Sequence, residues 1–206
     1  MMDLIVLVPD RNLEYAVKGI LARHQSLGIR PITVEVLSHP GHDPGCFGES
    51  PEFLQFAVRQ ASHALVVFDY EGSGQEYRMN RVQMETDLEQ RLSEAGWSGR
   101  SAAVIIAPEL ESWVWSDSPH VDIVLGWEGR RSSLREWLLG QHHMGRTAPK
   151  PPHPKDAMLA ALREAGKSRT SRLYSALAEK VSLDRCTDDA FLKFKRVLKE
   201  WFAEAP

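Results

Sequence analysis

The chain has 206 residues, of which 43% are apolar, and its formal net charge at pH 7 is −3. A chain of this length can bury a sizeable core, and the apolar fraction is ordinary for a globular protein. The small net charge argues against a polybasic nucleic-acid-binding protein, and no apolar run approaches the length of a membrane span.

The cysteines and the N-terminus indicate the expected compartment. Cys46 and Cys186 form no CxxC motif, so a disulfide framework is not expected and a reducing environment fits. The first ten residues, MMDLIVLVPD, are too short and too acidic for a signal peptide. We therefore expect a soluble cytoplasmic protein with no membrane partner.

The first half of the chain alternates short apolar runs with amphipathic segments. Buried strands are predicted at 3–8, 32–37, 64–68 and 102–107. Helices are predicted between them at 13–27, 51–61 and 76–95. Asn12 is the expected N-cap of the first helix, and the Gly- and Pro-rich stretch 38–50 is expected to lack regular structure. The order βαβαβαβ predicts an α/β fold, in which helices cover both faces of a four-stranded parallel sheet.

The sequence changes character after residue 117. We therefore divide the chain into an α/β domain at 1–117 and a helical C-terminal extension at 118–206. Helices of the extension are predicted at 132–139, 155–165, 169–181 and 188–203. The last of these has a stripe of large apolar residues at helical spacing, which predicts that it packs into the core.

Acidic residues follow three of the predicted strands. Asp10 follows the first strand, Asp69 and Glu71 follow the third, and Glu109 and Glu111 follow the fourth. Ligands of parallel sheets bind beyond the carboxyl ends of the strands, so these side chains are expected at one edge. Two carboxylates at i and i+2 and a third from another strand are suitable ligands for Mg²⁺. The competing interpretation is that these acids are solvated loop residues or helix N-caps.

Two further features border the predicted edge. Gly72 and Gly74 would leave space for a phosphate to approach the backbone. The stretch HPGHDPG contains His39, His42 and Asp43, which are residue types that ligate zinc. A turn with polar caps is the favoured interpretation of this stretch, and a third possibility is that His42 and Asp43 border the acidic edge.

Several short motifs resemble a known family. The sequence DYEG directly after a VVF strand resembles the DxD-type motif of the Toprim fold, the metal-binding module of topoisomerases, primases and overcoming-lysogenization-defect nucleases. The stretches APELESWVWSD (107–117), KPPHPKD (150–156) and CTDDAFLKF (186–194) resemble segments of small Toprim-like bacterial families tied to phage defence. The resemblance covers most of the chain and implies a Toprim-like component of a bacterial antiviral defence system.

The resemblance also implies an activity, which is metal-dependent cleavage of phosphodiesters in nucleic acid. Mg²⁺ or Mn²⁺ would be the cofactor, and nucleic acid and other defence-system proteins would be the partners. The implied site consists of Asp69, Glu71 and Glu111 as metal ligands, Asp10 or Glu14 as the general base, and Lys155, Arg78, Gly72 and Gly74 at the phosphate.

The sequence departs from the Toprim pattern at its first motif. Active Toprim domains carry a Glu at the end of the first strand, in a pattern such as VEGxxE, whereas this chain reads VPDRNLE at 8–14. Pro9 occupies the position of that Glu, Asp10 occupies the position of the Gly, and Glu71 replaces the second Asp of the DxD-type motif. Because proline can neither ligate a metal nor transfer a proton, two hypotheses remain: a Mg²⁺-dependent nuclease or phosphohydrolase, and a non-catalytic subunit that binds partner proteins in a defence complex.

Overall fold

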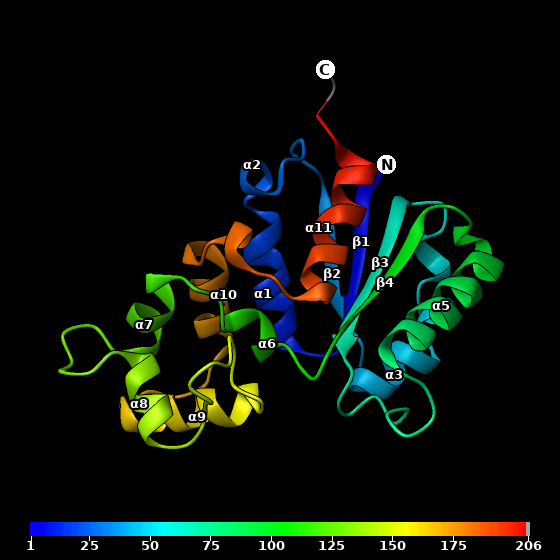
Figure 1. Cartoon of the computed structure of the whole chain (residues 1–206). Helices are drawn as coiled ribbons and strands as arrows, with labels where there is room; N and C mark the ends of the chain where they lie inside the picture. The colour runs from blue at the N-terminus through cyan, green and yellow to red at the C-terminus, as the bar shows by residue number, and fades with distance from the viewer. Residues whose placement is uncertain (205–206) are drawn as a thin grey trace.

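A four-stranded parallel sheet organises the molecule (Figure 1). The computed structural model describes residues 1–204. The strand order is β2-β1-β3-β4, and every neighbouring pair is parallel. The strands are β1 (Met2–Val8), β2 (Val34–Ser38), β3 (Ala61–Asp69) and β4 (Ser101–Ile106). The predicted α/β class with a four-stranded parallel sheet is confirmed.

Helices cover both faces of the sheet (Figure 1). They are α1 (Arg11–Leu21), α2 (His24–Leu27), α3 (His42–Gly48), α4 (Ser50–Phe53), α5 (Arg81–Leu92), α6 (Glu111–Val114), α7 (Pro119–Leu125), α8 (Leu134–Gly140), α9 (Pro154–Glu164), α10 (Ser171–Lys180) and α11 (Asp189–Phe202). Along β1, Leu4, Val6 and Val8 face one core and Ile5 and Leu7 the other, because successive side chains of a strand point to opposite sides. The first core packs against α1, α10 and α11, and the second against α3 and α5.

The segment after residue 118 shares the first of these cores. α11 packs against β4, and its Phe191 and Phe194 are buried in the same apolar cluster as the strand residues. α10 crosses α1 so closely that a Cβ added to Gly19 would lie 2.7 Å from the Cβ of Ala178. The predicted C-terminal helices therefore supply part of the layer that covers the sheet, while α7, α8 and α9 lie to one side of it (Figure 1).

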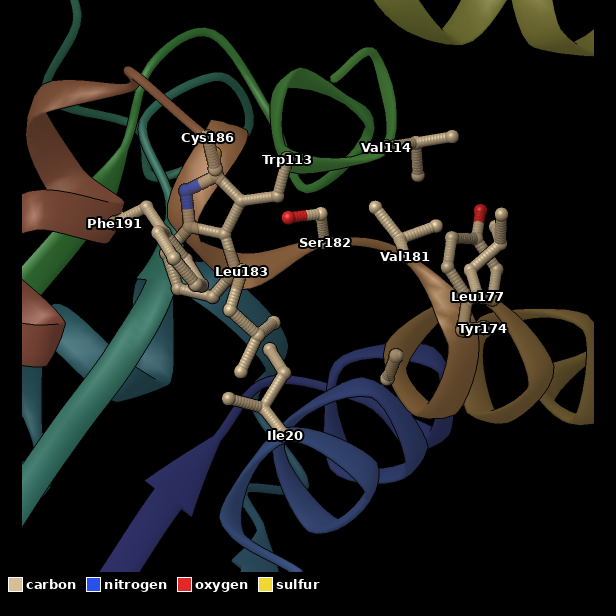
Figure 2. A pocket seen from close by; sticks show the side chains of 11 residues that line it. Ile20, Trp113, Val114, Tyr174, Leu177, Val181, Ser182, Leu183, Cys186 and Phe191 are labelled. Atoms are coloured by element: carbon tan, nitrogen blue, oxygen red, sulfur yellow. The ribbon is translucent and has the colours of Figure 1, made fainter. Parts of the chain in front are cut away.

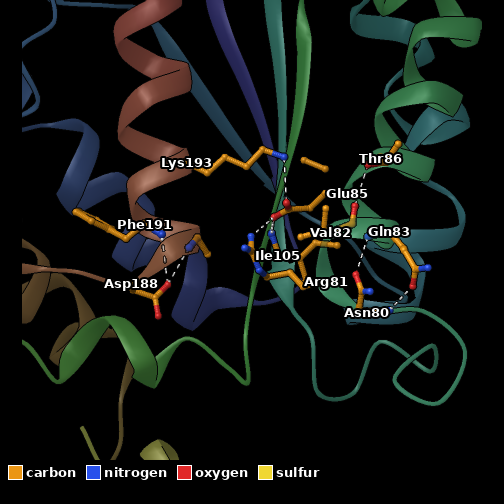
Figure 3. Close-up of polar contacts among 12 residues, drawn as sticks. Asn80, Arg81, Val82, Gln83, Glu85, Thr86, Ile105, Asp188, Phe191 and Lys193 are labelled. Carbon is orange, nitrogen blue, oxygen red and sulfur yellow. Dashed lines mark hydrogen bonds and ion pairs between the residues drawn. The ribbon is translucent and has the colours of Figure 1, made fainter. Parts of the chain in front are cut away.

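Side chains from both faces close the outer edge of β4 (Figure 3). The Glu85 carboxylate on α5 accepts a hydrogen bond from the Ile105 amide, and the Glu89 carboxylate accepts one from the Ala103 amide, each at 3.0 Å. Lys193 on α11 pairs with both carboxylates, 3.2 Å from Glu85 and 2.8 Å from Glu89. These contacts satisfy outward-facing amides that an unprotected edge strand offers to other chains.

The predicted helix 13–27 differs from the structure at both ends. α1 begins at Arg11 because Asp10, and not Asn12, is its N-cap; the Asp10 carboxylate accepts a hydrogen bond from the Leu13 amide at 2.9 Å. The helix ends at Leu21, and the separate short helix α2 follows.

The expectation that 38–50 lacks regular structure is wrong, because this stretch contains α3. Pro44 lies in the first turn of α3, where a helix tolerates proline. Gly45 allows the buried His39 ring to pack directly against the helix, since a Cβ at Gly45 would lie 2.2 Å from His39 Nδ1. The glycines and proline of this stretch therefore serve close packing of a short helix.

The next two predicted helices are also corrected. The segment 51–61 forms only α4 and a 3-10 turn at Gln55–Ala57, and β3 already begins at Ala61. The Ser50 hydroxyl does not cap a helix but donates to the Cys46 carbonyl. The helix predicted at 76–95 starts at Arg81, because Asn80 and Gln83 form a capping box there.

Cys46 and Cys186 are both buried free thiols. Within residues 1–204, no helix combines the length and the apolar character that crossing a membrane requires.

Candidate functional site

Acidic side chains gather at the carboxyl end of the sheet. Asp69 is the last residue of β3, and Asp10 directly follows β1 as the N-cap of α1. Glu109 and Glu111 follow β4, and Asp43 lies in the first turn of α3, which follows β2. Parallel strands end on the same side, and Figure 1 shows α1, α3 and α6 starting from that end. We call these five residues the acidic edge.

Asp69 is central to the acidic edge. Its amide donates a hydrogen bond to Asp43 Oδ1 at 2.9 Å, so the two acids are adjacent. Its own Oδ1 is buried and has no hydrogen-bond partner among the described residues. Burial raises the pKa of Asp69 well above its usual value, and the charges of Asp43, Glu111, Glu109 and Asp10 raise it further. The edge therefore concentrates negative charge around a poorly solvated carboxylate.

Asp43 shares this environment. Burial is the main cause that raises its pKa, and the nearby charge of Asp10 adds to the effect, whereas the Asp69 amide opposes it. The interpretation that Asp43 borders the acidic edge is thus confirmed. His42 lies beside it with a φ of 53°, which is a strained value for a residue other than glycine, and its Nδ1 is 3.2 Å from the Pro9 carbonyl.

The two glutamates of the acidic edge are held by residues from the C-terminal helices. Glu111 is only 1% exposed; its Oε1 accepts a hydrogen bond from the Tyr174 hydroxyl and lies 3.1 Å from the Arg169 guanidinium. Glu111 Oε2 is buried and has no partner among the described residues. Glu109 accepts hydrogen bonds from the Lys155 amide at 2.9 Å and from its ammonium at 3.1 Å. Each glutamate therefore already has one protein cation beside it.

Three other predicted residues, Glu14, Glu71 and Arg78, have other contacts or are exposed. Glu14 pairs with Lys18 and accepts a hydrogen bond from the Ser38 hydroxyl. Glu71 and Arg78 are exposed on the loop that follows β3. The structure therefore brings together Asp10, Asp69 and Glu111 of the predicted set, with Lys155 beside them through Glu109.

The glycine turn after β3 uses its amides internally. Gly72 and Gly74 have φ values of 91° and 78°, which glycine adopts without strain. The Gly72 amide donates to the carboxylate of Glu76, so this amide is not free for a phosphate in the conformation described. Tyr70 fixes the turn, since its hydroxyl oxygen lies 3.0 and 2.9 Å from the Glu76 and Met79 carbonyl oxygens, which share its single proton.

The carboxylate oxygens at the acidic edge are the ligand type that a hard cation prefers, but they do not form a complete coordination shell. No three His, Cys, Asp or Glu side chains within residues 1–204 are grouped so that they could hold a metal ion, and this includes the predicted zinc alternative at His39, His42 and Asp43. Mg²⁺ commonly takes one or two carboxylates and completes its shell with water and phosphate. Within residues 1–204, Asp69 Oδ1 and Glu111 Oε2 are the two buried carboxylate oxygens that lack a hydrogen-bond partner.

A separate apolar pocket lies between α1, α6 and α10 (Figure 2). Its walls include Ile20, Trp113, Leu177 and Phe191, and its cavity volume of about 40 Å³ is too small for a nucleotide. Tyr174 also lines it, while the hydroxyl of this residue binds Glu111. Tyr174 therefore connects the wall of this pocket to Glu111 of the acidic edge.

No protein-family model, curated protein or solved structure matches the chain.

Proposed function

We propose that the chain is a Toprim-like component of a bacterial antiviral defence system and that its acidic edge cleaves phosphodiesters of nucleic acid with a divalent cation. The proposal is carried by one observation: Asp69 and Glu111 each keep a buried carboxylate oxygen that finds no hydrogen-bond partner in the described part of the chain, in a cluster of five acids. Uncompensated buried carboxylates are costly, and a divalent cation would offset that cost. The defence context is supported only by the resemblance of the sequence motifs.

The residues that would hold the cation follow from the same observation. Asp69 Oδ1 and Glu111 Oε2 would be its protein ligands, which is the number of carboxylates that Mg²⁺ usually takes. Such an ion would orient a phosphate and stabilise the charge that develops on its oxygens. Lys155 and Arg169 beside the glutamates limit the net negative charge, so that an anionic substrate is not repelled as strongly.

Asp10 is the better of the two candidates for the general base. Asp10 lies close enough to Asp69 to raise the pKa of that residue. Asp10 Oδ1 caps α1 and Asp10 Oδ2 has only a long contact of 3.4 Å with Asn12, whereas both carboxylate oxygens of Glu14 are engaged, by Lys18 and Ser38. A base in this position would accept a proton from the water that attacks the phosphorus atom. Pro9, which lies where the Toprim pattern has its first Glu, cannot take this role.

A nuclease assay tests the proposal. Purified protein is incubated with Mg²⁺ or Mn²⁺ and with plasmid, single-stranded DNA or RNA, next to the variants Asp69→Asn and Glu94→Gln. We expect cleavage that falls at least about 100-fold in Asp69→Asn, because the variant loses a carboxylate that positions the cation. The control removes one charge from an exposed site and should keep full activity. Cleavage that survives in Asp69→Asn would contradict the assignment.

A second function, a non-catalytic subunit that binds other defence proteins, is favoured by two observations. Pro9 replaces the first Glu of the motif, and the glutamates of the acidic edge already have protein cations beside them. Co-expression of the tagged chain with its flanking genes separates the two functions. Absence of cleavage on every substrate, together with stoichiometric capture of one flanking gene's product, would support the subunit; Asp69-dependent cleavage would support the enzyme.

A further inference from the structure

The turn of residues 72–76 wraps around a carboxylate of its own. The Gly72 amide donates to Glu76 Oε1, and the amides of Glu76, Gly74 and Ser73 lie close enough to lower the pKa of this carboxylate, while the Ser73 amide also donates to the Tyr70 carbonyl at 3.3 Å. Successive amides that converge in this way form a nest, which is a concave site for anions. The positive φ angles of Gly72 and Gly74 allow the amides to point inward.

The nest lies next to the acidic edge and opens onto a pocket. A Cβ built on Gly72 would be 3.9 Å from Asp43 Oδ2, so the turn borders the acidic edge. The pocket is formed by the turn and by Ala107 and Pro108 after β4. Tyr77 stands at this pocket with its side chain fully exposed, as aromatic residues that stack on nucleobases do.

We propose that this nest binds a phosphate group and that the Glu76 carboxylate occupies it when no phosphate is bound. Carboxylate and phosphate both present anionic acceptor oxygens to amide donors, so a nest that holds the first has the donors for the second. Glu76 belongs to a loop at the surface, so its side chain can leave the nest without disturbing either core. The identity of the anion as a nucleic-acid phosphate rests on the proposed function.

The charge balance of the turn agrees with this assignment. The pKa of Glu76 is lowered, chiefly by its own amide and then by those of Gly72, Gly74 and Ser73, so the nest favours an anion over a neutral group. Glu71, which also lines the pocket, and the nearby Asp43 oppose a second anion. A phosphate should therefore bind more tightly when a divalent cation is present at the acidic edge.

Titration with inorganic phosphate tests the nest without any requirement for catalysis. We would compare the full chain, Glu76→Ala and the matched charge control Glu94→Ala by calorimetry in EDTA. Removal of the competing carboxylate should tighten phosphate binding by about tenfold or more in Glu76→Ala, whereas Glu94→Ala should resemble the unmodified chain. Equal affinities in all three proteins would overturn the proposal.

Amide chemical shifts locate the bound phosphate. In ¹⁵N spectra of Glu76→Ala, phosphate should shift the amides of Gly72, Ser73 and Gly74 most strongly. Shifts concentrated on other amides would overturn the proposal. It would also be overturned if Glu76→Ala bound no phosphate and the amide signals of residues 72–76 were missing from its spectrum. If phosphate binds in the nest but no Asp69-dependent cleavage occurs, the proposed function is wrong and the nest remains. If Asp69-dependent cleavage occurs but phosphate does not bind in the nest, only this inference is wrong.

Discussion

Replacing Asp69 by Asn should stabilise the protein when divalent cations are absent. The substitution removes a charge that is surrounded by Asp43, Glu111, Glu109 and Asp10 and whose Oδ1 lacks a partner among the described residues. It also introduces an amide donor among carboxylate acceptors. An unsatisfied buried polar group costs about 1–3 kcal/mol, so we expect a gain of about 2 kcal/mol. For a chain of this size that is a rise in Tm of about 4–8 °C.

The stabilisation should depend on pH in a defined direction. The pKa of Asp69 in the folded state lies above its ordinary value of 3.8, so the folded state binds the proton more tightly than the unfolded state does. The stabilising contribution of protonated Asp69 is therefore lost as the pH rises from about 3.8 through the folded-state pKa. The difference between Asp69→Asn and the wild type should be largest at pH 8 and should shrink as the pH is lowered.

Urea unfolding in EDTA, followed by circular dichroism at several pH values, measures this difference. Glu94→Gln changes one exposed charge and should stay within about 0.5 kcal/mol of the wild type. Added Mn²⁺ should stabilise the wild type by about 2.7 kcal/mol at 100 times its Kd, and the same concentration should stabilise Asp69→Asn by at most about 1.4 kcal/mol, because its Kd is at least about tenfold higher. A variant that is less stable than the wild type at pH 8 would refute the reasoning, because the Asp69 charge would then be satisfied within the fold.

Three other substitutions test the scaffold of the site by urea unfolding. Lys193→Met leaves Glu89 without a cation, whereas Glu85 keeps Arg81 at 2.9 Å, and should cost about 1–2 kcal/mol; a loss below about 0.5 kcal/mol would show that the Lys193 ion pairs are weak. Gly45→Ala forces a Cβ into the His39 ring and should cost about 1–3 kcal/mol. The control Gly48→Ala lies in the same helix, where an added Cβ meets nothing within 4 Å, and it should be neutral or slightly stabilising. Equal effects of the two substitutions would contradict the packing of His39 against α3. Tyr174→Phe removes a hydroxyl that donates to buried Glu111 and should cost about 1–3 kcal/mol; an unchanged stability would be inconsistent with that hydrogen bond.

The sequence predicts the sheet well because β1, β3 and β4 are buried along most of their length, whereas β2 is a partly exposed edge strand. Continuous apolar runs such as 3–8 have no alternative to a central strand, and their order fixes the edge at which Asp10 and Asp69 lie. Helix boundaries were less predictable, because they depend on side-chain caps. Asp10 and Asn12 are both good N-caps by type, and only the bond from Asp10 to the Leu13 amide decides between them.

The sequence predicts only some of the residues that form the acidic edge and its contacts. The glycine-rich surroundings of Asp43 predict a turn, whereas the residue lies in the short helix α3; the His-x-x-His-Asp stretch after the second strand is the signal that points to this residue. The contacts of Glu111 with Arg169 and Tyr174 span about 60 residues and depend on how α10 crosses the sheet, which no local pattern encodes. Spacing after β3 suggested that Glu71 and Asp69 act together, but their burial differs because the chain turns outward after the strand.

Calorimetric titration with Mn²⁺ tests the cation site at the acidic edge most directly. Asp69 and Glu111 each offer one buried, unpartnered oxygen, so we expect one Mn²⁺ per chain in the wild type. Binding should be at least about tenfold weaker in Asp69→Asn and unchanged in Glu94→Gln. A wild-type protein that takes up no Mn²⁺, or an Asp69→Asn variant that binds it equally well, would contradict a shared cation at this edge.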